Sequence, residues 1–344
     1  MPELPEVENS RRQFEKHAVG RRVASVVAAD DDKVLVAGRA STIAACEGHL
    51  VQAARRKGKH VWLELGSDDG ATSSSVCFHQ GMTGAFTVRG HSADGVQYKE
   101  FAVDAAAWPP KHAKLVLTLS DGGEIAFTNS RRFGRIRIFD RALAPGEGPV
   151  AALGWDPLLE RPSEQSFVDD LAARTSRRAV KSLLLDQSYI AGVGNWIGDE
   201  VLYHAGVHPA TPTNALNDAA RRSIYASLAA VVDTAVAANA DARLFPPSWL
   251  FHFRWTKKRA GSLDFHGRSI LFCTVGGRTS AVVLERQRKR GWTAPIALFW
   301  ATPDGADEPN SAAPALAKSL AKSRGSGKRA RAAVKVVARI VRRR

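Results

Sequence analysis

The first eight residues combine a proline with closely spaced carboxylates. The chain begins Met-Pro-Glu-Leu-Pro-Glu-Val-Glu, so removal of Met1 leaves Pro2 as an N-terminal secondary amine. A free α-amine has a pKa of about 7.7–8.0, and the positive end of a helix lowers it further. Such an amine can attack an aldehydic carbon and form an iminium, with Glu3 and Glu6 near enough in sequence to exchange protons with it. The alternative is an ordinary helix start, in which proline and acidic residues suit the first turn.

Positive charge is concentrated at the end of the sequence. The chain has 344 residues and a net charge of +15, and residues 318–344 contain eleven basic residues and no acidic one. This segment is rich in Ala, Ser and Gly, which predicts a disordered arm that binds a polyanion by releasing its counterions. A solubilising terminus or a targeting signal is the alternative.

Composition also excludes several classes of protein. The three cysteines, Cys46, Cys77 and Cys273, form no Cys-x-x-Cys pair, which argues against a disulfide framework or a cysteine-rich zinc site and favours a reducing compartment. We find no apolar run of about 18 residues and no basic leader, so we expect neither a membrane span nor a secretion signal.

Short apolar runs with a period of two residues fill residues 21–139. Val23–Val27, His60–Leu65, Lys114–Leu119 and Gly134–Phe139 are examples, and turn clusters separate them. This spacing predicts a β-sandwich or barrel. A helix that runs to about His17 precedes it.

The pattern changes after residue 140. Residues 142–162 are rich in Pro and Gly and predict a linker. Helical patterns follow over residues 163–174, 180–186, 195–205 and 214–239. Residues 269–275 and 279–284 then predict a β-hairpin across Gly276-Gly277-Arg278. The fold class is therefore α+β.

Five separated motifs resemble those of one enzyme family, and they keep its order over about residues 1–285. The N-terminal octapeptide resembles that of formamidopyrimidine-DNA glycosylases, which belong with endonuclease VIII-type enzymes. The other motifs are Arg55–His60, His79–Gly84, Asn129–Gly134, and Ala191–Asn195 followed by Asp199-Glu200. The resemblance implies residues 1–140 as a catalytic β-sandwich domain, 141–162 as a linker, 163–244 as a helix–two-turn–helix domain, 245–290 as a finger hairpin and 305–344 as the basic disordered tail.

The resemblance also implies a role for each matching residue. Pro2, Glu3, Glu6, Lys59 and Arg278 are the implied catalytic residues. Met82 and Phe133 are implied as wedges inserted into DNA beside a flipped base. The alternative is that these two apolar side chains pack in the protein core. Arg131 is expected to reach the orphaned base. The resemblance also implies phosphate contacts from six residues, which are Lys59, His112, Arg132, Lys181, Asn195 and Arg278.

Asn195 follows Gly192-Val193-Gly194 and is also expected to cap the next helix. Basic residues in this set could instead be solvated surface.

The finger segment departs from the pattern of many family members. Only Cys273 lies there, whereas those members bind zinc through four cysteines; Gly276–Ser280 is similar to the zincless finger of plant members, so we assign no metal and no cofactor. The segment between Phe253 and Phe265 lacks the Gly-Tyr-Phe lesion-capping loop of bacterial members. That departure puts efficient excision of 8-oxoguanine in doubt and favours formamidopyrimidines and further-oxidised guanine.

The sequence therefore predicts a monomeric, bifunctional DNA glycosylase and abasic-site lyase of base excision repair. Its partner is double-stranded DNA with oxidised bases or abasic sites, inside the cell, in the nucleoid or nucleus, and not a membrane. Two alternatives remain open. One is an endonuclease VIII-like preference for oxidised pyrimidines, and the other is a non-catalytic protein that binds damaged DNA.

Overall fold

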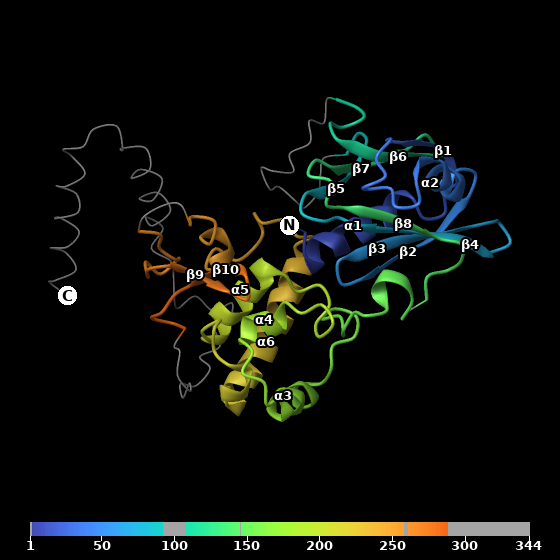
Figure 1. Ribbon diagram of the computed structural model, residues 1–344. Helices are drawn as coiled ribbons and strands as arrows, with labels where there is room; N and C mark the ends of the chain where they lie inside the picture. Colours follow the sequence, from blue (N-terminus) through green and yellow to red (C-terminus); the bar gives the residue numbers. More distant parts are fainter. Residues whose placement is uncertain (1, 92–106, 145, 258–260, 288–344) are drawn as a thin grey trace, which may run out of the picture. The chain divides into compact units, whose positions relative to one another are not determined.

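Two antiparallel β-sheets make up the N-terminal part of the chain. The computed structural model describes residues 2–91, 107–144, 146–257 and 261–287. The strand orders are β1-β6-β7-β5 and β2-β3-β4-β8, and the two sheets form the layers labelled in Figure 1. In chain order the strands are β1 (Val23–Ala28), β2 (Leu50–Lys57), β3 (His60–Gly66), β4 (Thr72–His79), β5 (Gly84–Val88), β6 (Ala113–Leu119), β7 (Glu124–Asn129) and β8 (Arg135–Phe139).

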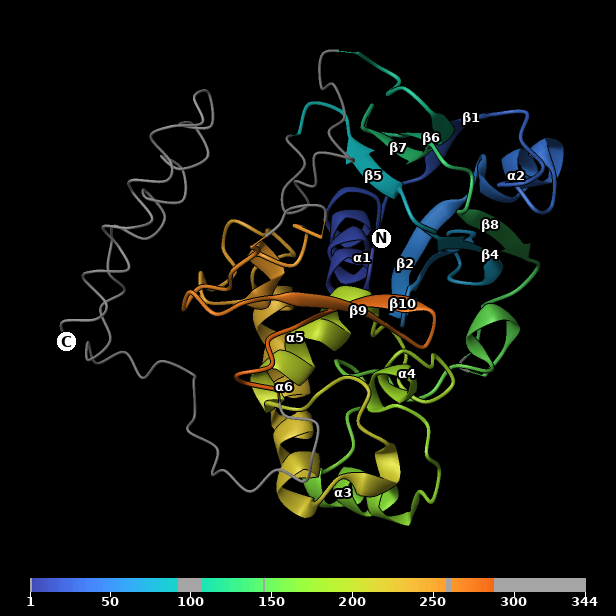
Figure 2. The same cartoon turned by 60° about the vertical axis from the view of Figure 1, so that its left-hand side comes forward.

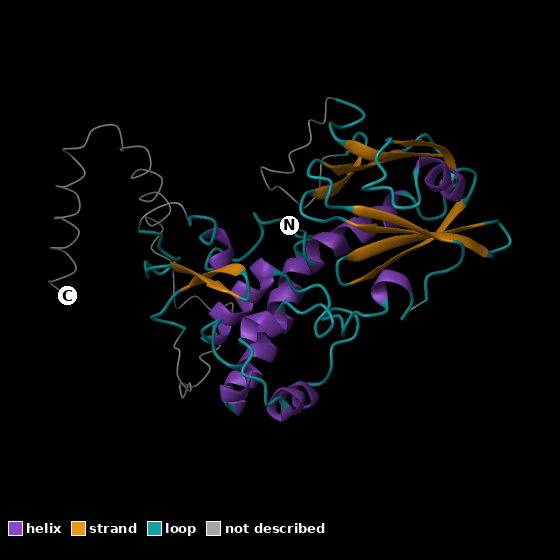
Figure 3. Cartoon of the chain, viewed as in Figure 1, coloured by secondary structure: helices purple, strands orange, loops and turns teal. Residues whose placement is uncertain are grey.

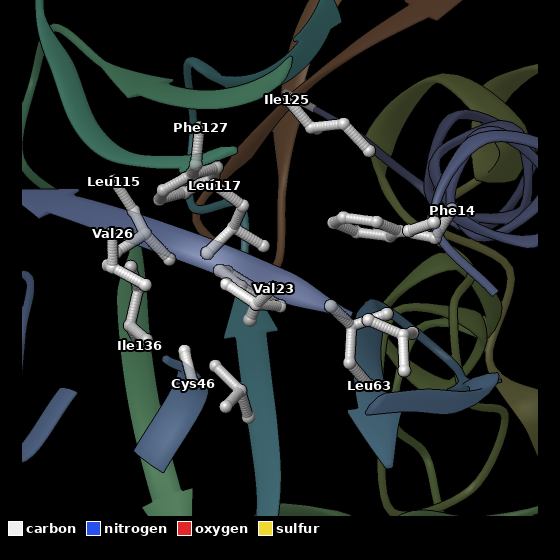
Figure 4. Packing of buried hydrophobic residues seen from close by; sticks show 14 of the residues in the cluster. Phe14, Val23, Val26, Cys46, Leu63, Leu115, Leu117, Ile125, Phe127 and Ile136 are labelled. Atoms are coloured by element: carbon white, nitrogen blue, oxygen red, sulfur yellow. The ribbon is translucent and has the colours of Figure 1, made fainter. Parts of the chain in front are cut away.

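The core lies between these sheets. Alternating apolar residues point inward from both sheets and form one buried cluster, in which Phe127 of one sheet faces Phe78 of the other with ring centroids 5.6 Å apart. Figure 4 shows several of its members, among them Val26, Leu117 and Ile136. Burial of alternating side chains is the driving force for such a sandwich. The predicted fold class is confirmed.

Two helices accompany the sandwich. Helix α1 (Leu4–His17) ends where the sequence predicted, and its Phe14 packs on Phe78 in the core. Helix α2 (Arg39–Cys46) was not predicted. It has only eight residues and buries just Thr42 and Cys46, so its sequence carries little helical periodicity.

The second part of the chain is helical, as Figure 3 shows by its colours. Ser163 and Asn217 cap two of its helices, because their side chains accept the amide hydrogens of Ser166 and Ala220 at 3.2 and 2.9 Å. The predicted helices are confirmed with small shifts at their ends. The elements are the 3₁₀ turn η2 (Gly148–Val150), α3 (Glu164–Ala173), α4 (Val180–Leu184), α5 (Asn195–Ala205), η3 (Thr213–Ala215), α6 (Asp218–Ala237) and η4 (Leu250–His252).

A β-hairpin closes the described chain. Strands β9 (Leu271–Val275) and β10 (Arg278–Val282) pair antiparallel, with Val275 opposite Arg278. The turn has two residues, Gly276 and Gly277, with φ of 58° and 73°, which favours glycine at both positions. Arg278 is thus the first residue of β10 rather than part of the turn. Figure 2 shows the hairpin in front of α5, and the Ala281 amide donates to Asp199 of that helix at 3.1 Å.

The predicted linker contains a buried anchor. Asp156 is fully buried and binds the Arg56 guanidinium of β2 at 2.6 and 3.1 Å. The domain boundaries stay predictions, and the basic tail lies outside the described residues. Within the described ranges, no helix has the length and apolar character needed to cross a membrane.

Candidate active site

The start of α1 is fixed by two of the predicted catalytic residues. Pro2 is buried, and Glu3 is the N-cap residue of the helix. The Glu3 amide donates to the Glu6 carboxylate at 2.9 Å, so the side chain three residues ahead satisfies an amide that the helix leaves open. Glu3 and Glu6 are each only 2% exposed. The sequence therefore holds two carboxylates in fixed positions next to Pro2.

The Glu3 carboxylate binds the beginning of a second helix. One oxygen accepts the Trp196 amide at 2.9 Å and the other accepts the Ile197 amide at 3.1 Å, in the first turn of α5. The positive end of the helix dipole favours a carboxylate at this place. A Cβ on Gly194 would lie 2.2 Å from the Glu3 carboxyl carbon, so only glycine allows this approach.

This contact corrects the expected role of Asn195. The N-cap position of α5 is Gly194, and Asn195 is the first helical residue. The expectation that Asn195 caps the helix is therefore wrong, because the Glu3 carboxylate satisfies the open amides. The Asn195 side-chain amide instead donates to the Thr279 carbonyl of β10 at 3.0 Å.

Glu6 contacts the same helix through a side chain. The Trp196 indole N–H donates to the Glu6 carboxylate at 3.1 Å, and Trp196 is buried. Glu6 thus joins the Glu3 amide to the indole of α5. This arrangement gives Glu6 a fixed orientation beside the N-terminal segment.

Lys59 approaches from the turn between β2 and β3. Its ammonium donates to the Val193 carbonyl at 2.9 Å, directly before α5. Burial lowers the pKa of Lys59, and the nearby Arg278 guanidinium adds to this effect, whereas the Glu3 and Glu6 carboxylates oppose it. The pKa of Lys59 therefore responds both to the two carboxylates and to the hairpin arginine.

Gln187 orders the loop that carries the Val193 carbonyl. Its side chain donates to that carbonyl at 2.8 Å and accepts the Gly192 amide at 3.0 Å. Gln187, Val193 and Trp196 were not predicted in this role. Their only signal was their place in the sequence, since Val193 lies within Ala191–Asn195, Trp196 directly follows it and Gln187 precedes it by four residues.

The structure overturns the phosphate contact expected of Lys181. This side chain is fully buried, and its ammonium donates to Asp199 at 2.6 Å, to the Ser280 hydroxyl at 2.7 Å and to the Thr279 carbonyl at 3.1 Å. Since all three donors are used inside the protein, Lys181 has none to offer a phosphate. The expectation was wrong because the sequence does not reveal these partners.

The two loops with the predicted wedges lie against each other. Gly81 fits only without a side chain, because a Cβ there would lie 2.4 Å from the Phe133 carbonyl carbon. The Asn129 side chain donates to the Gln80 carbonyl at 3.0 Å and joins the loops. Phe133 is 45% exposed and Met82 is half-buried. One rigid unit therefore presents both apolar side chains.

The predicted DNA-contacting cations surround this unit. The Arg131 guanidinium lies 5.2 Å from the centre of the Phe133 ring. Arg132 binds Asp31 through both carboxylate oxygens, the shortest distance being 2.9 Å. His112 is exposed and, like Arg132, has a positive φ. Their contacts to DNA stay predictions.

Asp31 is therefore firmly ionised. Burial acts against its charge, but hydrogen bonds from Arg132 and Lys114 lower the pKa of Asp31 to about 2. The ion pair of Arg132 with Asp31 fixes a loop that bends through a left-handed backbone.

The finger hairpin offers no ligand set for a metal. Cys273 is the one cysteine in β9 and β10, and the other two cysteines, Cys46 and Cys77, are buried in the N-terminal part. Within the described ranges, no three His, Cys, Asp or Glu residues gather as metal ligands would. The residues present do not fit a four-cysteine zinc site.

Comparison with known proteins places this site in a family. The family model described as the formamidopyrimidine-DNA glycosylase N-terminal domain matches residues 1–136, and the one for the corresponding H2TH domain matches residues 153–245. A formamidopyrimidine-DNA glycosylase of Arabidopsis thaliana is 40% identical over 293 residues, which are 85% of this chain and 72% of the relative. The Bacillus subtilis protein of that name is 29% identical over 84% of this chain and all of its own length.

Solved structures agree on the fold. A Lactococcus lactis formamidopyrimidine-DNA glycosylase variant in complex with DNA containing Fapy-dG superposes with a TM-score of 0.65 at 24% identity, over 84% of this chain and 100% of that one. A structure of the L. lactis formamidopyrimidine-DNA glycosylase bound non-covalently to DNA with an abasic site gives the same TM-score and identity over 83% of this chain. Two family models and a relative at 40% identity thus agree, and the chain belongs to the formamidopyrimidine-DNA glycosylase family.

Proposed function

We propose that this protein is a DNA glycosylase and abasic-site lyase of base excision repair, with Pro2 as its nucleophile. One observation carries the proposal: the Glu3 carboxylate beside Pro2 is fixed by two amides of α5, at 2.9 and 3.1 Å. A general acid must be held in place next to the reacting atoms. The names of the relatives support glycosylase activity on DNA.

The first step is substitution at the sugar. The Pro2 nitrogen forms a bond to C1′ of a flipped nucleotide, the bond between C1′ and the base breaks, and the base leaves with a proton. The base takes its proton from water, whereas the Glu3 carboxylate accepts the proton that the Pro2 nitrogen loses after its attack. Glu3 passes this proton to the ring oxygen, the sugar ring opens, and the nitrogen lone pair completes an iminium at C1′. Glu6 keeps the N-terminal segment oriented through its bond to the Glu3 amide.

Two eliminations follow from the iminium. Loss of a proton next to the iminium carbon expels the 3′ phosphate, and a second proton loss along the conjugated chain expels the 5′ phosphate. Lys59 and Arg278, whose charges influence each other in the structure, stabilise the negative charge on these leaving groups. Water then hydrolyses the iminium and frees Pro2.

The paired loops supply the DNA distortion that the first step requires. Extrusion of a base costs a few kcal/mol, and side chains that fill the vacated space lower this cost. Phe133 and Met82 stand on one rigid unit with Arg131 above the ring. We propose Arg131, Arg132, His112 and Asn195 as DNA contacts around it.

Oxidised purines are the proposed substrates. The loop motifs His79–Gly84 and Asn129–Gly134 resemble the purine-directed branch of the family. We expect faster release of formamidopyrimidine than of thymine glycol from matched duplexes. Faster release of thymine glycol would favour the endonuclease VIII-like alternative.

Covalent trapping tests the nucleophile. Protein whose N-terminus is verified by mass spectrometry is mixed with a duplex carrying an oxidised purine, and borohydride reduces the iminium to a stable amine. We expect a covalent adduct at Pro2 for the wild type and none for Pro2→Gly, because a primary amine on a flexible residue is placed less well. Lack of an adduct from the processed wild type, or an undiminished adduct from the variant, would contradict the mechanism.

A further inference from the structure

A buried ionic cluster lies beneath the finger hairpin. Its centre is the pair of Lys181 from α4 and Asp199 from α5, with 2.6 Å between ammonium and carboxylate and no exposure of either side chain. The Lys181 ammonium also donates to the Ser280 hydroxyl and to the Thr279 carbonyl. Three donors therefore meet three acceptors, and two of the acceptors belong to β10.

The second carboxylate oxygen of Asp199 binds the hairpin as well. It accepts the Ala281 amide at 3.1 Å and the Arg254 guanidinium at 2.7 Å. Residues 279, 280 and 281 are thus each bonded to the Lys181–Asp199 pair. They follow Arg278 directly in the sequence.

The hairpin needs this support. A two-stranded hairpin is marginally stable by itself in water, and its three-residue contact with the ionic cluster lies at the start of β10, next to the turn. Gly276 also rests on α4, because a Cβ there would lie 2.3 Å from the Ser182 hydroxyl. Helices α4 and α5 therefore both determine where the backbone of Arg278 is placed.

A buried ion pair is a costly means of support unless its polar atoms are satisfied. The Lys181 ammonium and both Asp199 oxygens have partners at hydrogen-bond distance. The cluster thus has the directional bonds that an apolar contact would lack, and it fixes the register of β10 against α5.

We propose that Lys181 is a positioning residue, which acts through Thr279 and Ser280 to hold Arg278 in its place at the start of β10. The proposal rests on the proposed function, because Arg278 is there assigned to the leaving phosphates. Loss of the Lys181 ammonium frees the start of β10, so Arg278 spends less time in the position that the cluster gives it. The second elimination then slows more than the attack of Pro2.

The test compares Lys181→Met with Arg278→Ala and with the double variant. Single-turnover cleavage of a duplex with an abasic site gives the ratio of δ- to β-elimination products, and borohydride trapping gives the rate of iminium formation. We expect Lys181→Met to lower the δ-to-β ratio about tenfold and trapping far less. This is a smaller loss than the roughly 100-fold cost of a reacting group displaced by 1 Å, because Arg278 still reaches its position part of the time. The double variant should match Arg278→Ala. Lys16→Met, which removes an exposed lysine of α1, is the charge-matched control and should behave as wild type.

Two results would overturn the inference. One is a wild-type δ-to-β ratio in folded Lys181→Met, and the other is a double variant in which the two losses multiply. If Lys181→Met melts early, Ser280→Ala carries the test, because it removes one acceptor and leaves the Lys181–Asp199 pair in place; an unchanged ratio there would also overturn it. Failure of the wild type to form any trapped adduct would instead contradict the proposed function, so the two failures are distinguishable.

Discussion

Gly194→Ala displaces the Glu3 carboxylate without changing the Glu3 side chain itself, so it tests the importance of its position. Gly194 has extended backbone angles (φ −128°, ψ −159°), which alanine adopts without strain. Its new methyl group would lie 2.2 Å from the Glu3 carboxyl carbon, whereas ordinary contact begins at 3.4 Å. Glu3 must therefore move by about 1 Å or more, and its bonds to the Trp196 and Ile197 amides lengthen or break.

The expected losses follow from these bonds. A hydrogen bond to a charged group contributes about 1.5–3 kcal/mol, so loss of two costs about 3–6 kcal/mol of unfolding free energy. Since the unfolding entropy grows with chain length, a chain of 344 residues should lose roughly 4–8 °C in melting temperature. Because a displacement of about 1 Å at a reacting group costs about 100-fold in rate, base excision should slow at least that much.

The assay is single-turnover base excision together with thermal melting. Gly198→Ala is the matched control in the same helix, since its methyl group would meet only Leu185 at an ordinary 3.5 Å. It should keep the wild-type rate and gain up to about 1 kcal/mol of stability from helix propensity. A Gly194→Ala protein with wild-type rate and melting temperature would refute the reasoning about Glu3.

Two further predictions concern pH and salt. Burial lowers the pKa of His60 to about 3 and that of His79 to about 4, from an ordinary 6.5, and each is also affected by nearby cations. The unfolded chain therefore binds protons near pH 6.5 that the folded chain does not bind. The free energy of unfolding is thus highest above that pH and falls as pH decreases. The unfolding free energy should drop by about 2–4 kcal/mol between pH 7.5 and 5.0; urea titrations measure it, and an equal drop in His60→Asn/His79→Gln would contradict the assignment. Deletion of residues 311–344 should weaken lesion-independent DNA binding and make the slope of log affinity against log salt shallower by several units. An unchanged slope would reassign the tail to targeting.

Local patterns were sufficient for most of the fold. Helix α5 begins and ends where its apolar period predicted, and the paired glycines located the hairpin turn to within a residue. Such signals lie within a few residues of each other, and sequence inspection finds them. The Lys59 and Arg278 motifs were likewise read from short segments, and the charges of Glu3 and Arg278 both influence the pKa of Lys59.

Partners that are distant in sequence were not predictable in this way. Glu3 was predicted as a catalytic residue beside Pro2, but no short segment of the sequence shows that its carboxylate binds amides 193 and 194 residues ahead. Lys181 looked like a surface cation because its partners Thr279 and Ser280 are 98 and 99 residues away. Asp156 lies in a Pro- and Gly-rich segment that predicts an exposed loop, and its burial becomes understandable only from its contact with Arg56. Burial of a charge is decided by the tertiary partner, which a single sequence does not display.

The bond between Glu3 and α5 makes assembly of the two halves a condition for reactivity. Trp196 and Ile197 leave the ribosome long after the sandwich. The nascent protein therefore has the proposed nucleophile, Pro2, before the proposed acid, Glu3, gains the two amides that orient its carboxylate. Proteolysis between residues 140 and 190 followed by separation of the pieces would likewise leave Glu3 without these two amides. The proposed cleavage of a DNA strand therefore requires an intact polypeptide chain.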